Sequence, residues 1–232
     1  MNTTIMMDYL VQLEKERQLF HKYTLIDTGK MPSENFNIKL APRLTKKAQD
    51  YGFPLKIMNM ICSLDETNRN IIRINQTWEM INSNSEEITV FNTMSLHIIN
   101  SANAHIIHDI RRFIDDIISI HWILSQTEIV TEVKMCGLGP YLSDANRVYN
   151  PFDSFRDFLM LINAIENAYK HSIANNMSTL IGRDEPYIFA LYSKNNKNFL
   201  HPQLIQVPLK ELIVQFNKFY KTSFLLLENV DK

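Results

Sequence analysis

The stretch from Ser85 to Gln126 constrains the fold more than any other part of the chain. At about 100° per residue, one side of this stretch carries a continuous series of large apolar side chains. They are Ile99, Ile106, Ile110, Phe113, Ile117, Ile120 and Leu124. The opposite side carries His97, Ser101, His105, His108, Arg112, Asp115 and Ser119. The pattern predicts a long amphipathic helix against which the other elements pack.

Glycine and proline are scarce in the rest of the chain, with only five and eight copies in 232 residues, and hydrophobic residues make up 45%. This composition favours helices and supplies enough apolar surface for a sizeable core. We therefore predict a mainly α fold, a multi-helix bundle around the long central helix, in one domain over residues 1–232. An internal boundary, if there is one, is expected at 137–140, where Gly137, Gly139 and Pro140 interrupt the pattern.

The elements around the central helix follow from periodicity and from start and stop residues. Apolar residues at helical spacing predict helices over 4–26, 42–51, 54–80 and 152–173, and a last helix from Pro208. Ser83 and Glu86 match a capping box that would start the central helix. The runs 187–192 and 204–207 are β-prone and predict a small β-hairpin before the last helix.

Net charge and cysteine content limit the partners and the location that we expect for the protein. The formal net charge of −1 gives no overall basic field to hold DNA or an anionic membrane. Cys62 and Cys136 fit neither a zinc knuckle nor a disulfide framework, which predicts a reducing, cytoplasmic location. The mixed-charge N-terminus predicts no signal peptide, and polar residues interrupt the uncharged run 88–108, so no membrane span is expected.

The first candidate site is His105, His108 and Asp109 on the polar side of the central helix. Imidazole and carboxylate groups on one helix face are suitable ligands for a divalent metal, although other helices would have to complete the coordination. The His108-Asp109 doublet resembles that of the HD-domain phosphohydrolases, which implies a metal-dependent hydrolase as one alternative. The other interpretation is a hydrated face tied by ion pairs four residues apart.

The pairs expected under that second interpretation are His108 with Arg112, Arg111 with Asp115, and Arg112 with Asp116. His121 differs from these residues because it projects close to the apolar stripe. We predict a hydrogen-bonded histidine in the core at this position.

The second candidate site lies in LINAIENAYKHSIANN, where polar residues interrupt an apolar helix face. Glu166 falls near the centre of that face, so it should be buried and paired, because an unpaired buried carboxylate is costly. Asn163, Asn167, Lys170 and His171 accompany it. Two interpretations remain open: a polar pocket containing an acid or base, and an internal hydrogen-bond network that joins this helix to the central one.

The paired long helices and the sequence Asn167-Ala-Tyr-Lys-His171 resemble HEPN-type helical bundles, many of which are ribonucleases of toxin and antiviral systems. The resemblance covers about 85–176 and implies RNA cleavage by Asn167, Lys170 and His171. The family's motif has an Arg several residues before its His, whereas Asn167 stands at that place here. The alternative Arg17 to His21 is too tightly spaced, so the resemblance also fits an inactive relative.

Phosphate-binding glycine loops, the Gly-x-Ser-x-Gly elbow, Cys-x-x-Cys and His-Glu-x-x-His are all missing from the sequence. The leading hypothesis is therefore a non-catalytic interaction or regulatory module, without a cofactor, that binds a protein partner or forms a dimer. Whether the chain is an enzyme is left open. The alternatives are a HEPN-like ribonuclease acting on RNA and a metal-dependent phosphohydrolase that needs a divalent metal.

Overall fold

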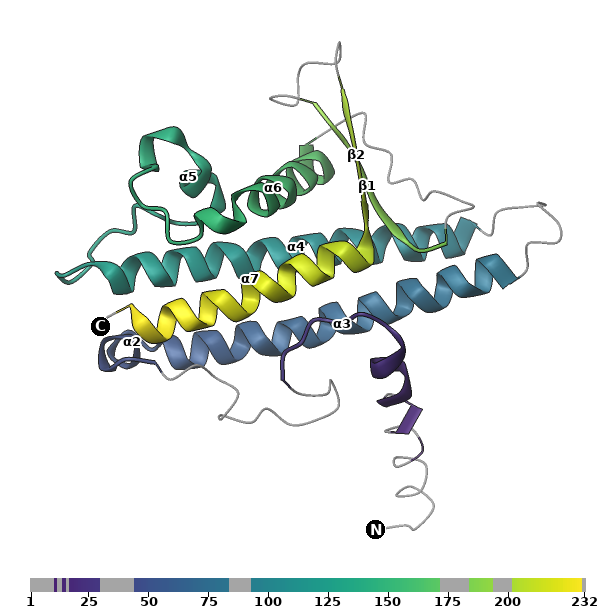
Figure 1. Ribbon diagram of the computed structural model, residues 1–232, viewed down its shortest axis with the longest axis horizontal. Coiled ribbons are helices and arrows are strands. Elements are labelled where there is room, and N and C mark those ends of the chain that lie inside the picture. Colours follow the sequence, from purple (N-terminus) through teal and green to yellow (C-terminus); the bar gives the residue numbers. More distant parts are fainter. Residues whose placement is uncertain are drawn as a thin grey trace.

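The computed structural model describes residues 11, 14–15, 17–29, 44–83, 93–171, 184–193 and 202–230 (Figure 1). The fold is a mainly α-helical bundle with one small hairpin, as predicted. Its elements are α2 (Lys46–Asp50), α3 (Phe53–Ser83), α4 (Thr93–Ser125), α5 (Leu138–Leu142), η2 (Asp144–Asn146), η3 (Asp153–Phe155), α6 (Arg156–His171), β1 (Tyr187–Tyr192), β2 (Gln203–Pro208) and α7 (Leu209–Asn229).

The central helix α4 lies between two layers: α3 and α7 cover one side, and α5 and α6 pack on another (Figure 1). All seven apolar residues of the predicted stripe are buried. Ile107, Ile114 and Ile118 lie outside that stripe and are also fully buried. Because α4 has neighbours on more than one side, its apolar surface is wider than a single amphipathic stripe.

The hairpin β1–β2 is confirmed at the predicted place. The strands are antiparallel, with Tyr187 opposite Pro208 and Tyr192 opposite Gln203. Pro208 is the last residue of β2 and the N-cap of α7, so the strand runs directly into the last helix. Proline suits this place because its fixed φ fits a helix start and its missing N–H is not needed there.

A short segment before α2 is held between two helices by asparagine side chains. Asn68 of α3 accepts a hydrogen bond from the Ile26 N–H at 2.8 Å and donates to the Ile26 carbonyl at 2.9 Å. Asn217 of α7 does the same for the Asp27 N–H and the Leu25 carbonyl, at 2.8 and 2.9 Å. An amide side chain has a donor and an acceptor, so each asparagine satisfies two main-chain groups of an irregular segment.

The expected start of the central helix at Ser83 is wrong, and a lysine of α2 binds the other end of this helix. Ser83 does not cap the central helix: it is the last residue of α3, and its hydroxyl donates to the Met80 carbonyl at 3.1 Å. Glu86 lies outside the described residues. At the other end of α4, the Lys47 ammonium of α2 donates to the carbonyls of Leu124 and Gln126. A lysine there stabilises the C-terminal end of α4, where carbonyl groups lack helical partners.

The buried apolar residues form one core cluster with members from Leu25 to Leu227, so the segment at 137–140 contributes Leu138 to the same core as its neighbours. Among the helices that the structure describes, none has a segment of sufficient length and apolarity to cross a membrane.

Candidate functional site

Glu166 of α6 is buried and paired, as predicted. Only 3% of its surface is exposed, and its Oε1 lies 3.0 Å from His108 Nδ1 of α4 and 2.6 Å from Lys170 Nζ. An ionised carboxylate only accepts hydrogen bonds, so the Nδ1 of His108 is the donor. This fixes the tautomer of neutral His108 and leaves Nε2 as the acceptor nitrogen. The side chains of His108 and Lys170 are both about half exposed, so the two donors lie between Glu166 and solvent.

One turn further along α4, Arg111 and Asp115 make the second polar link. Arg111 Nε donates to both carboxylate oxygens of Asp115, at 3.0 and 3.1 Å, which confirms that predicted pair. The guanidinium also donates to Asn163 Oδ1 of α6 at 2.5 Å. Asp115 in turn accepts the N–H of Leu138, the first residue of α5, at 2.6 Å. Together with Glu166 and His108, these residues form a polar interface that joins α4 to both α5 and α6.

Gly137 is required where α5 meets Asp115. Its φ is +147°, a region that side chains disfavour, and a Cβ at this position would lie 2.6 Å from Asp115 Oδ1. The same oxygen receives the Leu138 N–H, so the close approach is part of the link between α4 and α5. Gly139, two residues later, has open space around the position of a Cβ.

The residues of the proposed metal site face different neighbours. Asp109 Oδ2 accepts a hydrogen bond from the Thr67 hydroxyl of α3 at 3.1 Å, and burial raises the pKa of this carboxyl above its ordinary value. His108 faces α6 instead, and His105 is exposed. Within the described part of the chain, no group of three or more His, Cys, Asp or Glu side chains is arranged to hold a metal ion.

Asp116 on the polar face of α4 pairs with another helix, and not with the residue four positions earlier in its own helix. The sequence predicted a pair with Arg112, but Asp116 pairs with Lys56 of α3 at 2.7 Å. The cation that pairs with Asp116 thus comes from the adjacent helix. This pair borders a small hollow of about 100 Å³ between α3 and α4.

The three residues of the proposed ribonuclease site lie at the end of α6. Lys170 is bound to Glu166, Asn167 is half-buried, and His171 is exposed as the last residue of the helix. The structure therefore brings Lys170 together with His108 through Glu166. It records no bond from His171 to either residue.

His121 is a core histidine, as predicted. It is buried, and its Nδ1 lies 2.7 Å from the Tyr149 hydroxyl, while its ring packs edge-on against Phe152. Burial disfavours the charged imidazolium and lowers the pKa of His121 from 6.5 to about 4. Burial also raises the pKa of Tyr149. Both groups are therefore neutral near pH 7 and contribute to the core.

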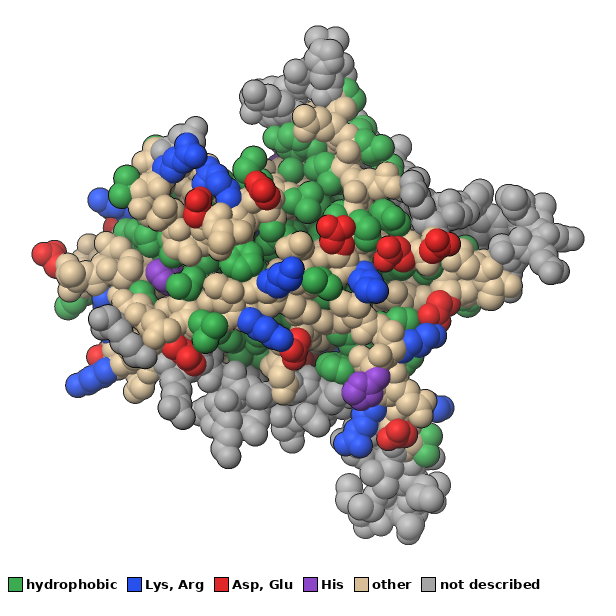
Figure 2. Space-filling model, in the orientation of Figure 1, with side chains coloured by type: hydrophobic (Ala, Val, Ile, Leu, Met, Phe, Trp, Pro, Cys, Tyr) green, Lys and Arg blue, Asp and Glu red, His purple; other side chains and the backbone are tan. Residues whose placement is uncertain are grey.

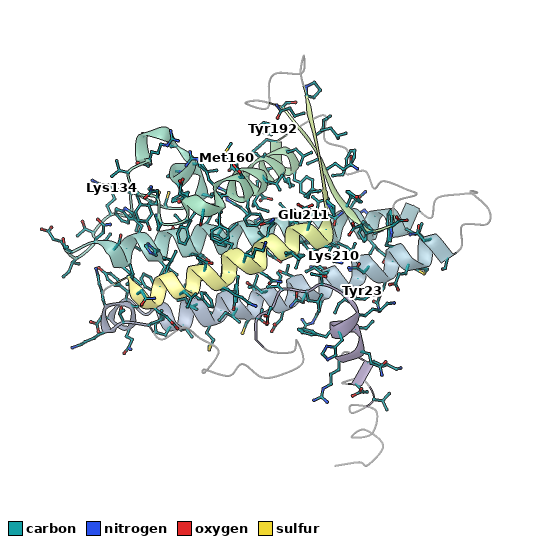
Figure 3. The ribbon with its side chains drawn as sticks, viewed as in Figure 1. Tyr23, Lys134, Met160, Tyr192, Lys210 and Glu211 are labelled. Atoms are coloured by element: carbon teal, nitrogen blue, oxygen red, sulfur yellow. The ribbon has the colours of Figure 1, made fainter. Side chains whose placement is uncertain are left out.

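A cavity of about 230 Å³ at the start of α7 was not found by sequence reasoning. Four separate segments build it, and Figure 3 shows Tyr23 and Lys210 beside each other where the chain before α2 passes the first turn of α7. The polar members of its lining include Lys22, Tyr23, Asn75, Glu185 and Lys210. No periodic pattern could have grouped them, because they come from segments that are far apart in the sequence.

Comparison with known proteins adds no family assignment: no family model, curated protein or solved structure matches this chain. The resemblance to HEPN-type bundles consequently stays a prediction.

We predict that Gly137→Ala lowers the free energy of unfolding by about 2 to 4 kcal/mol, because the Cβ requires a strained φ and displaces the Asp115 carboxylate. Gly139→Ala is the matched control and should change stability by less than about 0.5 kcal/mol. Urea unfolding of both variants measures this. Equal effects of the two substitutions would contradict the role given to Gly137.

The lowered pKa of His121 predicts that the free energy of unfolding depends on pH. Its pKa in the folded protein, about 4, lies below the unfolded value of 6.5, so the unfolded state binds more protons between these values. The stabilisation is complete above pH 6.5 and is lost as the pH falls, by about 3 kcal/mol between pH 7 and pH 4. His121→Gln should lack this component in urea unfolding across that range. A variant with the same pH dependence as the natural sequence would refute the assignment.

Proposed function

We propose that this protein is a non-catalytic interaction or regulatory module of helical-bundle type. The observation that supports it best is that the charged side chains at the interface of α4 with α5 and α6 are bonded to other protein groups. Glu166, Arg111 and Asp115 bond across helix boundaries, and Lys170 is held by Glu166. Such contacts satisfy the hydrogen-bonding capacity of buried charges and fix the position of α6 on α4.

The pair His108–Glu166 also has features of an oriented general base, because a carboxylate binds Nδ1 and the imidazole is about half exposed. A catalytic site would further need a place for substrate beside that nitrogen. Neither the cavity at the start of α7 nor the hollow between α3 and α4 is lined by His108, Glu166 or His171. The hydrogen bonds that Glu166 accepts from His108 of α4 and from Lys170 support a structural role for this pair.

A surface for a protein partner is available at the hairpin. Among the described residues, β1 is the one strand that pairs with β2, and Gln203, Leu204 and Gln206 of β2 are exposed. The other strand differs, because the Phe189 carbonyl of β1 accepts a hydrogen bond from the Tyr169 hydroxyl of α6. An open edge strand offers its main-chain groups to an added strand. We propose β2 as the side on which a partner, or a second copy of the chain, binds.

An RNA cleavage assay tests the proposed non-catalytic function against the ribonuclease hypothesis. Purified protein incubated with single-stranded RNA, without metal and with Mg²⁺, Mn²⁺ or Zn²⁺, should give no more cleavage than its His171→Ala variant. That variant should keep the melting temperature within about 1 °C, because an exposed helix-terminal side chain contributes little to stability.

Cleavage that His171→Ala abolishes without a change in melting temperature would contradict the proposal and favour the HEPN-like ribonuclease. Cleavage that depends on an added metal and is lost in His108→Ala would favour the metal-dependent hydrolase instead.

A further inference from the structure

The cavity at the start of α7 is lined by two opposite charges for which the described part of the chain provides no ion-pair partner. Lys210 and Glu185 both line it, and in the part of the chain that the structure describes neither takes part in a salt bridge. Glu185 is half-buried although it has no ion-pair partner. The two side chains therefore line the same space without neutralising each other. A carboxylate that is partly removed from water gains most from a cation placed in the cavity.

The other basic member of the lining is already neutralised. Lys22 Nζ lies 2.7 Å from Glu79, which also accepts a hydrogen bond from the Tyr23 hydroxyl at 3.0 Å. Among the described residues of the lining, Lys210 is thus the cation without an ion pair, and Glu185 is the anion without one. Figure 2 shows both basic and acidic side chains on the face of the molecule that α7 crosses. The lining does not favour a ligand that carries one sign of charge only.

The surrounding neutral groups complete a polar site. Asn75 also lines the cavity, and its side-chain amide nitrogen donates to the Ile71 carbonyl at 2.8 Å, so its Oδ1 is the group of this side chain that can accept a hydrogen bond. Lys210 lies in the first turn of α7, whose N-cap Pro208 provides no side-chain cap, so the partial positive charge of the helix end adds to that of Lys210. The Leu209 N–H is already bonded to the Pro186 carbonyl at 2.9 Å.

We propose that this cavity binds a small zwitterion of amino-acid size, with its anionic group at Lys210 and its ammonium group at Glu185 and Asn75. The volume of about 230 Å³ limits the ligand, because drug-sized molecules need pockets of roughly 300 Å³ or more. One such molecule would satisfy both unpaired charges at the same time. The proposal is independent of the proposed function: RNA cleavage would overturn that function and leave the cavity as it is.

The test uses the full chain and calorimetric titration with free L-amino acids, with acetate and methylamine as probes that carry one charge each. We expect at least one amino acid to bind, and acetate and methylamine to bind at least ten times more weakly. Lys210→Gln and Glu185→Gln should each weaken the binding about tenfold or more. Glu211→Gln and Lys218→Gln change exposed charges on α7 outside the lining, and they should leave the affinity within about twofold.

Melting curves without ligand serve as the folding control, and all four variants should melt within about 2 °C of the natural sequence because their side chains are exposed or half-exposed. If one glutamine variant unfolds, Lys210→Met or Glu185→Asp replaces it in the titration. Absence of binding by every amino acid would overturn the proposal. So would binding of acetate as strong as that of the amino acid, or binding that Glu185→Gln does not weaken.

Discussion

The carboxylate of Glu166 is the group on which the arrangement of this bundle depends. It is almost completely removed from water, and an uncompensated charge in that position would cost several kcal/mol. Lys170 of α6 and His108 of α4 both donate to the same oxygen, and the His108 contact forms only when α6 lies on α4 in one register. The hydrogen bond from Arg111 of α4 to Asn163 of α6 also needs this register, further along the same interface.

The position of α6 in turn determines where its neighbours lie. α6 packs against β1, and the Tyr169 hydroxyl donates to the Phe189 carbonyl at 3.1 Å. α5 is attached through the Asp115 carboxylate, which also holds Arg111. The polar interface therefore connects the central helix with the hairpin on one side and with α5 on the other. Hydrogen bonds have directional geometry, which apolar packing alone lacks, so this interface supplies specificity to a core that is otherwise aliphatic and aromatic.

Local patterns in the sequence were sufficient for the helices, for the hairpin and for the burial of Glu166. Each of these depends on the periodicity of one segment, as in the stripe from Ile99 to Leu124. Partners across helices were not predictable in this way. Nothing in the spacing of α4 selects Lys56 for Asp116, and nothing in α2 indicates that Lys47 caps α4.

The candidate sites also show that contacts between elements could not be predicted from one segment of sequence. His105, His108 and Asp109 are neighbours in sequence, yet Asp109 bonds to α3 and His108 to α6. The cavity at the start of α7 is the opposite case, because Lys22, Glu185 and Lys210 are far apart in sequence and line one space. Proximity along one helix thus suggested a metal site that the side-chain contacts do not support. The cavity at the start of α7 could be found only from the tertiary structure.

The most direct test of this account is a double-mutant cycle for the unfolding free energy at pH 7, with His108→Ala, Glu166→Ala and the double variant. We predict that Glu166→Ala alone costs about 1 to 3 kcal/mol and that the two substitutions are coupled by at least about 0.5 kcal/mol. The control cycle pairs Glu166→Ala with His105→Ala, which removes an exposed imidazole from the same helix and should be additive. Additivity within about 0.3 kcal/mol in both cycles would contradict the claim that the pair His108–Glu166 holds α6 on α4.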